Sequence, residues 1–403
     1  MTEGRPLPPR PPRRLESPLE AVEAARDLAA RFREGAGRRH RERELPFDEV
    51  ERYTESGLGS ITVPRAYGGP ELPLEAVVEV FEIISAADGS LGQIPQNQFG
   101  VVALLKDFAT PEQKARFFGD ILAGHRIGNA GPEKGRRAVT HNETRLRREG
   151  RRLVLTGERF YSTGAIFAHW IPTRANDDDG RPVQVWVRRD AEGVTVLDDW
   201  RSFGQRTTAS GTVLFDQVEI AEEDVLPVWQ FATKAGLAGP ISQLVQAAID
   251  SGIAIEALKD AGAFVRERAR PWMDSGVAAA HDDPTIVHEF GRLHADLHAA
   301  QELLREAART IDRIASRPVT DETSAAASVA VAEAKVATTR IALDAAETLF
   351  DVAGSSATRA GHDLDRHWRN ARVHTLHDPV RWKLHLLGNH ALNGVLPARH
   401  QWN

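Results

Sequence analysis

The sequence predicts an α+β protein that is mainly α-helical, with a helical region, a β region and a helical bundle following one another along the chain. Three observations predict it: capped amphipathic stretches over 17–124, alternating apolar and polar residues over 125–234, and a long Ala-rich repeat within 235–403. We interpret these blocks as an N-terminal helical domain, a middle antiparallel β domain and a C-terminal four-helix bundle. Residues 1–16 are rich in Pro and Arg and are predicted to form a disordered arm.

The first block contains two capping boxes and three amphipathic stretches. Ser17 and Glu20 have the spacing of a capping box with Pro at the first helical position, and Thr110 and Gln113 repeat the arrangement. A turn is predicted at 63–70, where the sequence VPRAYGGP supplies glycines that allow positive φ. Amphipathic helices are predicted between the two caps at 46–57, 74–88 and 97–109.

The second block changes to a period of two, which is typical of half-buried strands. The sequence NDDDG at 176–180 predicts a turn between two of the strands. Apolar residues alternate with polar ones around residues 153–155, 183–187, 194–196, 213–215 and 218–220.

The third block contains one long helix with a seven-residue repeat. Asp283 and Pro284 predict the start of the preceding helix. Neither a GxGxxG motif after a strand nor a GxxxxGK[ST] motif occurs, so any phosphate must bind through another geometry. The repeat, which predicts packing in an antiparallel bundle, consists of Val329, Val336, Leu343 and Phe350, with Ala332 and Ala346 between them.

Composition narrows the function classes. The 403 residues include no cysteine, which excludes disulfides, zinc–thiolate sites, iron–sulfur clusters and a thiol nucleophile. The formal net charge of −6 disfavours a nucleic-acid partner, and no apolar stretch approaches the ~18 residues that span a membrane. We therefore expect a cytoplasmic protein without a membrane partner. Only Met1 and Met273 are methionines, which reflects either compositional drift or economy of sulfur.

The order of the blocks and four local sequences resemble the acyl-CoA dehydrogenase superfamily. The sequences are VPRAYGG at 63–69, GNAGPE at 128–133, FYSTG at 160–164 and RERARPW at 266–272. The resemblance implies that Asn129, Ser162 and Thr163 contact a flavin. It also implies a homotetramer in which Arg270 reaches the flavin phosphate of a neighbouring subunit, with Trp272 packed beside it.

The sequence RNARVHTLHDP at 369–379 departs from the dehydrogenases, many of which place a Glu base near Asp378. It is similar instead to the flavin-dependent monooxygenases of this fold, which include the dibenzothiophene monooxygenases and related sulfur-acquisition oxidoreductases. The turn at Gly354 and Ser355 has fewer glycines than the adenosine-binding turn of the dehydrogenases. FMN is therefore predicted as the flavin, with FAD as the alternative.

The resemblance implies a two-component monooxygenase. A separate NAD(P)H-dependent flavin reductase would supply reduced FMN, which reacts with O2 through a C4a-hydroperoxyflavin to oxygenate a small organosulfur substrate. Three alternatives stay open: an FAD-dependent acyl-CoA dehydrogenase, an N- or aromatic-carbon hydroxylase of the same fold, and a non-catalytic protein that has kept the fold.

His374 and His377 are the main catalytic candidates. They are three residues apart and are expected to share one helical face. His377 is expected at a helix C-terminus, where the dipole favours the protonated imidazole, so it is assigned as proton donor with His374 in support. Asp378 is expected to cap the next helix, with Pro379 at its first position. The alternative is a structural histidine pair.

Five further residues complete the predicted site. Asn129 and Ser162 are expected to hold the flavin, or alternatively to cap a turn and to end a strand. Ser210 lies in the loop at 200–211 that resembles the segment holding the flavin edge and phosphate. Gln93 and Asn97 are expected on the substrate and oxygen side, or alternatively in a polar first helical turn. The histidine spacings contain no HExxH, so no metal site is predicted.

Overall fold

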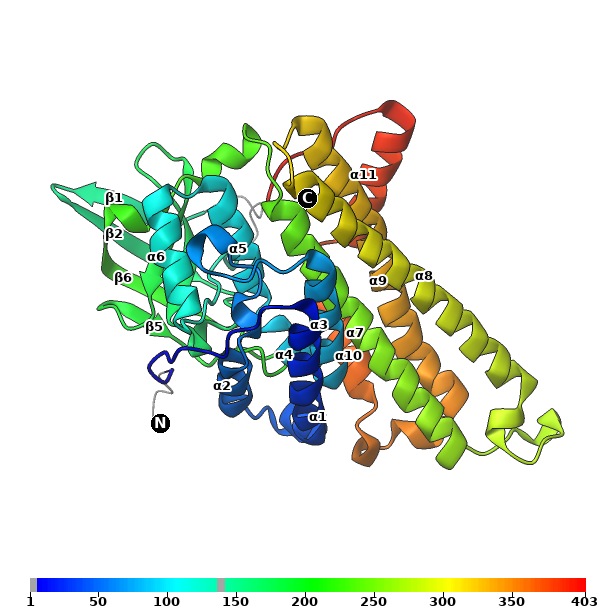
Figure 1. The fold of residues 1–403 in the computed structure, drawn as a ribbon. Helices are drawn as coiled ribbons and strands as arrows, with labels where there is room; N and C mark the ends of the chain where they lie inside the picture. Colours follow the sequence, from blue (N-terminus) through cyan, green and yellow to red (C-terminus); the bar gives the residue numbers. More distant parts are fainter. Residues whose placement is uncertain (1–5, 136–141) are drawn as a thin grey trace.

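The computed structural model describes residues 6–135 and 142–403 (Figure 1). Helices of the first block stand between a β-sheet on one side and a group of long helices on the other. The fold is mainly helical with one sheet, so the predicted fold class is confirmed.

The first block folds into the predicted helices with the additional short helix α4, and the two predicted caps form. Ser17 accepts a hydrogen bond from the Glu20 backbone N–H at 3.2 Å, while Thr110 and Gln113 form a reciprocal capping box. The helices are α1 (Pro18–Glu42), α2 (Phe47–Glu55), α3 (Leu74–Ala87), α4 (Gly89–Gln93), α5 (Gln96–Phe108) and α6 (Pro111–Leu122).

The described part of the N-terminal arm has no regular secondary structure, yet it packs against the body of the protein. The Arg13 N–H donates to the Glu55 carbonyl at 2.9 Å, and the Leu15 side chain is buried. A Cβ at Gly124 would lie 2.1 Å from the Arg10 carbonyl oxygen, so glycine permits the close approach of the two segments. Residues 6–16 therefore lie against the body without helix or strand, and residues 1–5 of the predicted disordered arm are outside the described part of the chain.

The sheet contains the predicted strands but is mixed instead of purely antiparallel. Its order is β5-β6-β2-β1-β3-β4-β7. Five pairings are antiparallel, whereas β1 and the bridging residues Ile127 and Ala130 run parallel to β3. Alternation of apolar residues fixes which face is buried but not the direction of the partner strand. The strands are β1 (Arg145–Glu149), β2 (Arg152–Arg159), β3 (Trp170–Asn176), β4 (Pro182–Arg188), β5 (Val194–Val196), β6 (Val213–Ile220) and β7 (Val225–Leu226).

The third block packs around the long helix α9, which contacts four other helices of the block. Ala332, Ala346 and Val336 are buried, whereas Val329, Leu343 and Phe350 of the seven-residue repeat are only half-buried. None of the helices within the described ranges has the length and apolar character needed to cross a membrane. The helices are α7 (Ala238–Glu267), α8 (Pro284–Ala315), α9 (Asp321–Ala353), α10 (Asp365–His374) and α11 (Val380–Asn393).

Candidate active site

A cavity of about 1380 Å³ lies between the sheet, helices α4, α5, α7 and α11, and the C-terminal segment. Its walls come from parts of the chain that are far apart in sequence, so the fold itself creates it. Six predicted site residues line it: Gln93, Asn97, Asn129, Thr163, Ser210 and His377.

His377 lies in the turn after α10, where both of its ring nitrogens have partners. Nδ1 lies 2.7 Å from the main-chain oxygen of His374, and Nε2 lies 2.6 Å from the Gln93 side-chain nitrogen. A carbonyl oxygen can only accept, so Nδ1 carries the hydrogen and Nε2 accepts from the Gln93 amide. These contacts assign the neutral imidazole, with its lone pair directed toward Gln93.

The structure favours a neutral His377 over the protonated form expected from its place at a helix end. Desolvation by the surrounding protein, followed by the charge of His374, lowers its pKa to about 4. The helix-terminus effect was expected to raise the pKa, but desolvation of the cation outweighs it. At neutral pH His377 can therefore accept a proton at Nε2, and Gln93 has a direct role in holding its ring.

Behind His377, a buried charged chain links α10 to α7 and α9. His374 Nδ1 lies 2.5 Å from Asp250 Oδ1, and Lys335 donates to Asp250 Oδ2 at 2.9 Å. Burial alone would raise the pKa of Asp250, but Lys335 and His374 outweigh it and hold the pKa well below its usual range. Because His374 is anchored to Asp250, its carbonyl is fixed where it orients His377.

Sequence reasoning missed Asp250 and Lys335. Both are fully buried, and each lies within an otherwise apolar or small-residue stretch of its helix. A charged residue at such a position is costly unless it is paired, so it signals a partner elsewhere in the fold. The sequence offers this signal but does not identify the partner.

Asp378 does not cap α11, which corrects the predicted role. The helix begins at Val380 after Pro379, without a side-chain cap. Asp378 instead lies 3.5 Å from Lys383 Nζ, and the Gln243 amide, turned with its nitrogen toward the carboxylate, donates to both oxygens at 3.0 and 3.2 Å. This carboxylate is buried and engaged, which makes it a poor candidate for a free base.

The residues predicted to hold the flavin form a polar wall on the sheet side. The Ser162 hydroxyl is buried and has no hydrogen-bond partner in the described structure. Next to it, Ser210 Oγ lies 2.7 Å from both Thr163 Oγ1 and Thr208 Oγ1. Asn129 lines the cavity beside this cluster. An unpartnered buried hydroxyl close to further hydroxyls and an amide fits the nitrogen- and oxygen-bearing edge of a flavin ring.

Five predicted cofactor residues do not line the cavity: Ser162 is buried behind its wall, and the other four lie farther away. Arg270 and Trp272 are in the connection from α7 to α8, at the end of the long helices opposite α11 (Figure 1). The Trp272 side chain is 68% exposed. Gly354 and Ser355 form an exposed turn after α9. Within one chain these four residues do not meet the flavin wall, so their roles toward a neighbouring subunit stay predictions.

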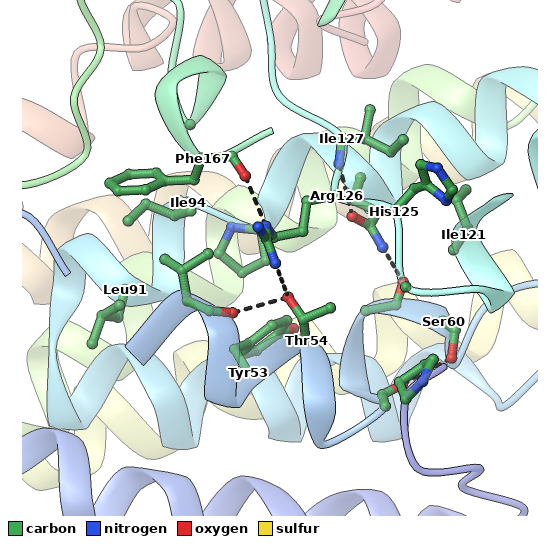
Figure 2. A pocket seen from close by; sticks show the side chains of 18 residues that line it. Tyr53, Thr54, Ser60, Leu91, Ile94, Ile121, His125, Arg126, Ile127 and Phe167 are labelled. Carbon is green, nitrogen blue, oxygen red and sulfur yellow. Dashed lines mark hydrogen bonds between the residues drawn. The ribbon is translucent and has the colours of Figure 1, made fainter. Parts of the chain in front are cut away.

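A second cavity, of about 40 Å³, lies under the N-terminal arm (Figure 2). Arg126 crosses it, donating to the Phe167 carbonyl at 2.7 Å, to Glu51 at 2.8 Å and to Thr54 at 3.4 Å. Ile94 and Gly164 form part of its wall. Because its central cation is paired with Glu51 and its volume is small beside that of the first cavity, we assign it a structural role.

Comparison with known proteins places these observations in a family. The N-terminal domain of acyl-CoA dehydrogenases matches residues 17–125, and their C-terminal domain matches 244–382. A dibenzothiophene monooxygenase of Mycolicibacterium goodii is 30% identical, over 94% of this chain and 95% of the relative. SfnC of Pseudomonas putida, a probable FMNH2-dependent monooxygenase, is 30% identical over 94% and 97%.

A solved structure agrees with these relatives. FMN-bound TdsC from Paenibacillus sp. A11-2 superposes with a TM-score of 0.90 at 31% identity, covering 95% of this chain and 100% of TdsC. The match includes the sequence blocks that carry the resemblance noted above. The chain therefore belongs to the acyl-CoA dehydrogenase family and, within it, to the branch of flavin-dependent monooxygenases.

Proposed function

We propose that this protein is the oxygenase of a two-component system that transfers one oxygen atom from O2 to a small organosulfur compound. A separate NAD(P)H-dependent reductase supplies reduced FMN. The observation that carries the proposal is the neutral imidazole of His377 in the wall of the cavity that Asn129 and Thr163 also line. When bound, reduced FMN supplies the electrons that activate O2.

The side chains around the cavity have separate roles in the proposed reaction. Asn129, Ser162, Thr163 and Ser210 hold and orient the flavin ring through the polar wall. His377 takes up or returns a proton at Nε2, and Gln93 keeps the ring at the cavity wall. His374 and Asp250 fix the carbonyl that positions His377. His374 and Asp250 are buried behind the cavity wall, whereas His377 and Asn129 are accessible from the cavity, where a bound flavin and substrate would displace water.

A homotetramer in the cytoplasm completes the proposal. Arg270 would bind the flavin phosphate of a neighbouring subunit, with Trp272 packed beside it and with Gly354 and Ser355 near the same ligand. The exposure of Trp272 and Met273, at 68% and 83%, supports an intersubunit role for this connection, because large apolar side chains are usually covered.

Acyl-CoA dehydrogenation is disfavoured by the state of Asp378. A dehydrogenase base must approach the substrate with a free carboxylate, whereas Asp378 is paired with Lys383 and Gln243. Oxygenation of nitrogen or aromatic carbon would use the same reduced flavin and O2 and would differ only in the substrate that the cavity selects. An assay must therefore offer amine and indole substrates beside the organosulfur compounds.

The test supplies reduced FMN through an independent NADH-dependent flavin reductase and offers organosulfur, amine and indole substrates in parallel. We expect mass spectrometry to detect an oxygenated organosulfur product, with FMN supporting more turnover than FAD. Reduction of an artificial electron acceptor by acyl-CoA, without any oxygenated product, would overturn the proposal in favour of a dehydrogenase.

A further inference from the structure

Arg174 and Gln184 face each other in the sheet at one wall of the large cavity. They are directly paired between β3 and β4, and both line the cavity. The Arg174 backbone N–H donates to the Ala130 carbonyl at 3.2 Å, next to Asn129. The pair therefore lies one strand away from a residue assigned to the flavin.

The Arg174 guanidinium is a cation without an anionic partner. Among residues 6–135 and 142–403, no Asp or Glu forms an ion pair with it. Its Nη2 donates to Gln401 Oε1 at 2.5 Å, and its guanidinium carbon lies 5.9 Å from the centre of the Phe231 ring. Arg has five N–H donors, so these contacts leave most of them free for a ligand.

Other cations near Arg174 are already paired with carboxylates and do not reduce its positive charge. Burial, followed by the charge of Arg159, lowers the pKa of Arg174 to about 10, which still leaves the group protonated at neutral pH. Arg159 itself is paired with Glu133 at 3.2 Å, and Lys383 with Asp378 at 3.5 Å. Arg174 thus differs from its neighbours Arg159 and Lys383, because its own positive charge is not compensated by a carboxylate of the described residues.

Gln184 adds a second, independent observation. Its side chain is buried, and its Oε1 has no hydrogen-bond partner. A buried amide without a partner is costly, and rotation about its terminal bond can direct the N–H group at a ligand beside Arg174. A guanidinium fork and an amide on one wall match two oxygens of a planar or pyramidal oxyanion.

We propose that Arg174, Gln184 and Gln401 form a subsite for the oxyanion of the substrate, and that the substrates are organic sulfinates. This inference rests on the proposed function. In a sulfinate, both oxygens that the guanidinium binds are on the sulfur that reacts, so the subsite presents the sulfur lone pair to the flavin side. Arg174 is then a residue that determines specificity.

The reaction balances with the reagents of the proposed function. The sulfinate RSO2⁻, O2 and FMNH2 give the sulfonate RSO3⁻, FMN and H2O. One S–O bond forms as the O–O bond breaks, and sulfur loses two electrons. The other oxygen atom becomes water with two electrons and two protons from FMNH2.

The flavin phosphate is the other anion that could meet Arg174, and the sheet order argues against it. The hydroxyl-rich loop that resembles the phosphate-holding segment leads into β6. Strands β2 and β1 lie between β6 and β3, which carries Arg174. The Arg174 side chain instead contacts the C-terminal segment, through its hydrogen bond to Gln401.

The test compares two substrates of similar shape and different charge. Methanesulfinate is anionic and dimethyl sulfoxide is neutral, and both are pyramidal with a lone pair on sulfur. We expect Arg174→Met to raise KM for methanesulfinate roughly 10- to 100-fold, the effect of losing a charged hydrogen-bond pair, with little change for dimethyl sulfoxide. Arg174→Lys should lie between. Arg181→Met, in the exposed β3–β4 turn, is the matched control and should change neither value.

A binding measurement tests the subsite without any need for turnover. Calorimetry with unreactive methanesulfonate on the flavin-free protein should show binding to wild type that Arg174→Met abolishes. Two results would overturn the assignment. The first is an equal rise in KM for methanesulfinate and dimethyl sulfoxide in Arg174→Met. The second is weaker binding of FMN, but not of riboflavin, with KM for methanesulfinate unchanged, which would assign Arg174 to the flavin phosphate. Failure of the proposed function is distinct, because wild type would then form only hydrogen peroxide with either substrate.

Discussion

The Gln93 amide donates a hydrogen bond to Nε2 of His377 at 2.6 Å, and the other end of the amide, Oε1, is buried without a partner. Rotation of the amide would exchange these atoms. The pair can thus satisfy His377 in its neutral form, through the amide nitrogen, and in its protonated form, through the amide oxygen. Gln93 is therefore suited to follow a proton that His377 gains and returns.

Replacement of His377 by Ala should uncouple oxygen consumption from product formation. Product formed per reduced FMN should fall by about 10²- to 10⁴-fold, the usual loss of a general acid–base group, while O2 is still reduced to hydrogen peroxide. Parallel assays of product and peroxide measure the ratio. Wild-type coupling in this variant would contradict the role of His377, and unchanged flavin binding is the control for folding.

The lowered pKa of His377 predicts a pH-dependent stability. Its folded pKa of about 4 lies below the ordinary value of 6.5, so the unfolded chain binds the proton more tightly between these values. Stability is therefore fully present above pH 6.5 and is lost as the pH falls toward 4. His377→Gln should reduce the slope of unfolding free energy against pH, by less than the full value for one proton because the side chain is exposed to the cavity. Urea unfolding at pH 5, 6 and 7 measures it.

His40 and His169 also contribute to the pH dependence of the unfolding free energy. Burial lowers the pKa of each to about 4 as well, so both contribute a slope of the same sign. The His377→Gln protein should retain their part. A slope identical to that of wild type would show that His377 is not kept neutral in the folded protein.

The buried Asp250–Lys335 pair should matter for stability and for coupling in separable ways. Asp250→Asn leaves Lys335 as an unpaired buried cation and should cost about 3–5 kcal/mol of unfolding free energy. Asp250→Asn combined with Lys335→Met removes both charges and should regain much of that stability. Product per reduced FMN should stay low in the double variant, because His374 has lost its carboxylate. Wild-type coupling in the double variant would limit Asp250 to a structural role.

Arg270 provides a test of the proposed assembly. Light scattering at micromolar concentration should give the mass of four chains, and a monomer would contradict the assembly. Arg270→Ala should leave the mass unchanged and weaken binding of FMN but not of riboflavin, since only FMN carries the phosphate. Equal loss for both flavins would assign Arg270 another role.

Local signals in the sequence predicted much of the fold. Thr110 and Gln113 locate the start of α6 because a cap depends on residues three apart, and the alternation at 183–187 locates β4 for a similar reason. The parallel direction of β1 beside β3 depends on contacts between distant segments, so alternation could not predict it.

The candidate site was predicted less completely, for the same physical reason. His377, Asn129 and Thr163 were found through motifs, and the structure brings them to one cavity. The charge state of His377 and the pairing of Asp378 with Lys383 follow from burial and long-range contacts that spacing does not encode. In the sequence Arg174 is an ordinary polar residue of a strand. Only the folded structure shows that no described carboxylate forms an ion pair with it.

The incorporation of oxygen-18 from ¹⁸O2 tests the central claim most directly. Wild-type protein would receive enzymatically reduced FMN, ¹⁸O2 and one of three substrates: methanesulfinate, dimethyl sulfoxide or dibenzothiophene. Mass spectrometry would then measure the masses of the products. A monooxygenase of organosulfur compounds predicts one ¹⁸O atom for each oxygenation: one in the product of methanesulfinate or dimethyl sulfoxide, and one or two in the sulfoxide or sulfone of dibenzothiophene. The product should be unlabelled when the label is in water. Product without ¹⁸O, or peroxide alone with all three substrates, would contradict the account.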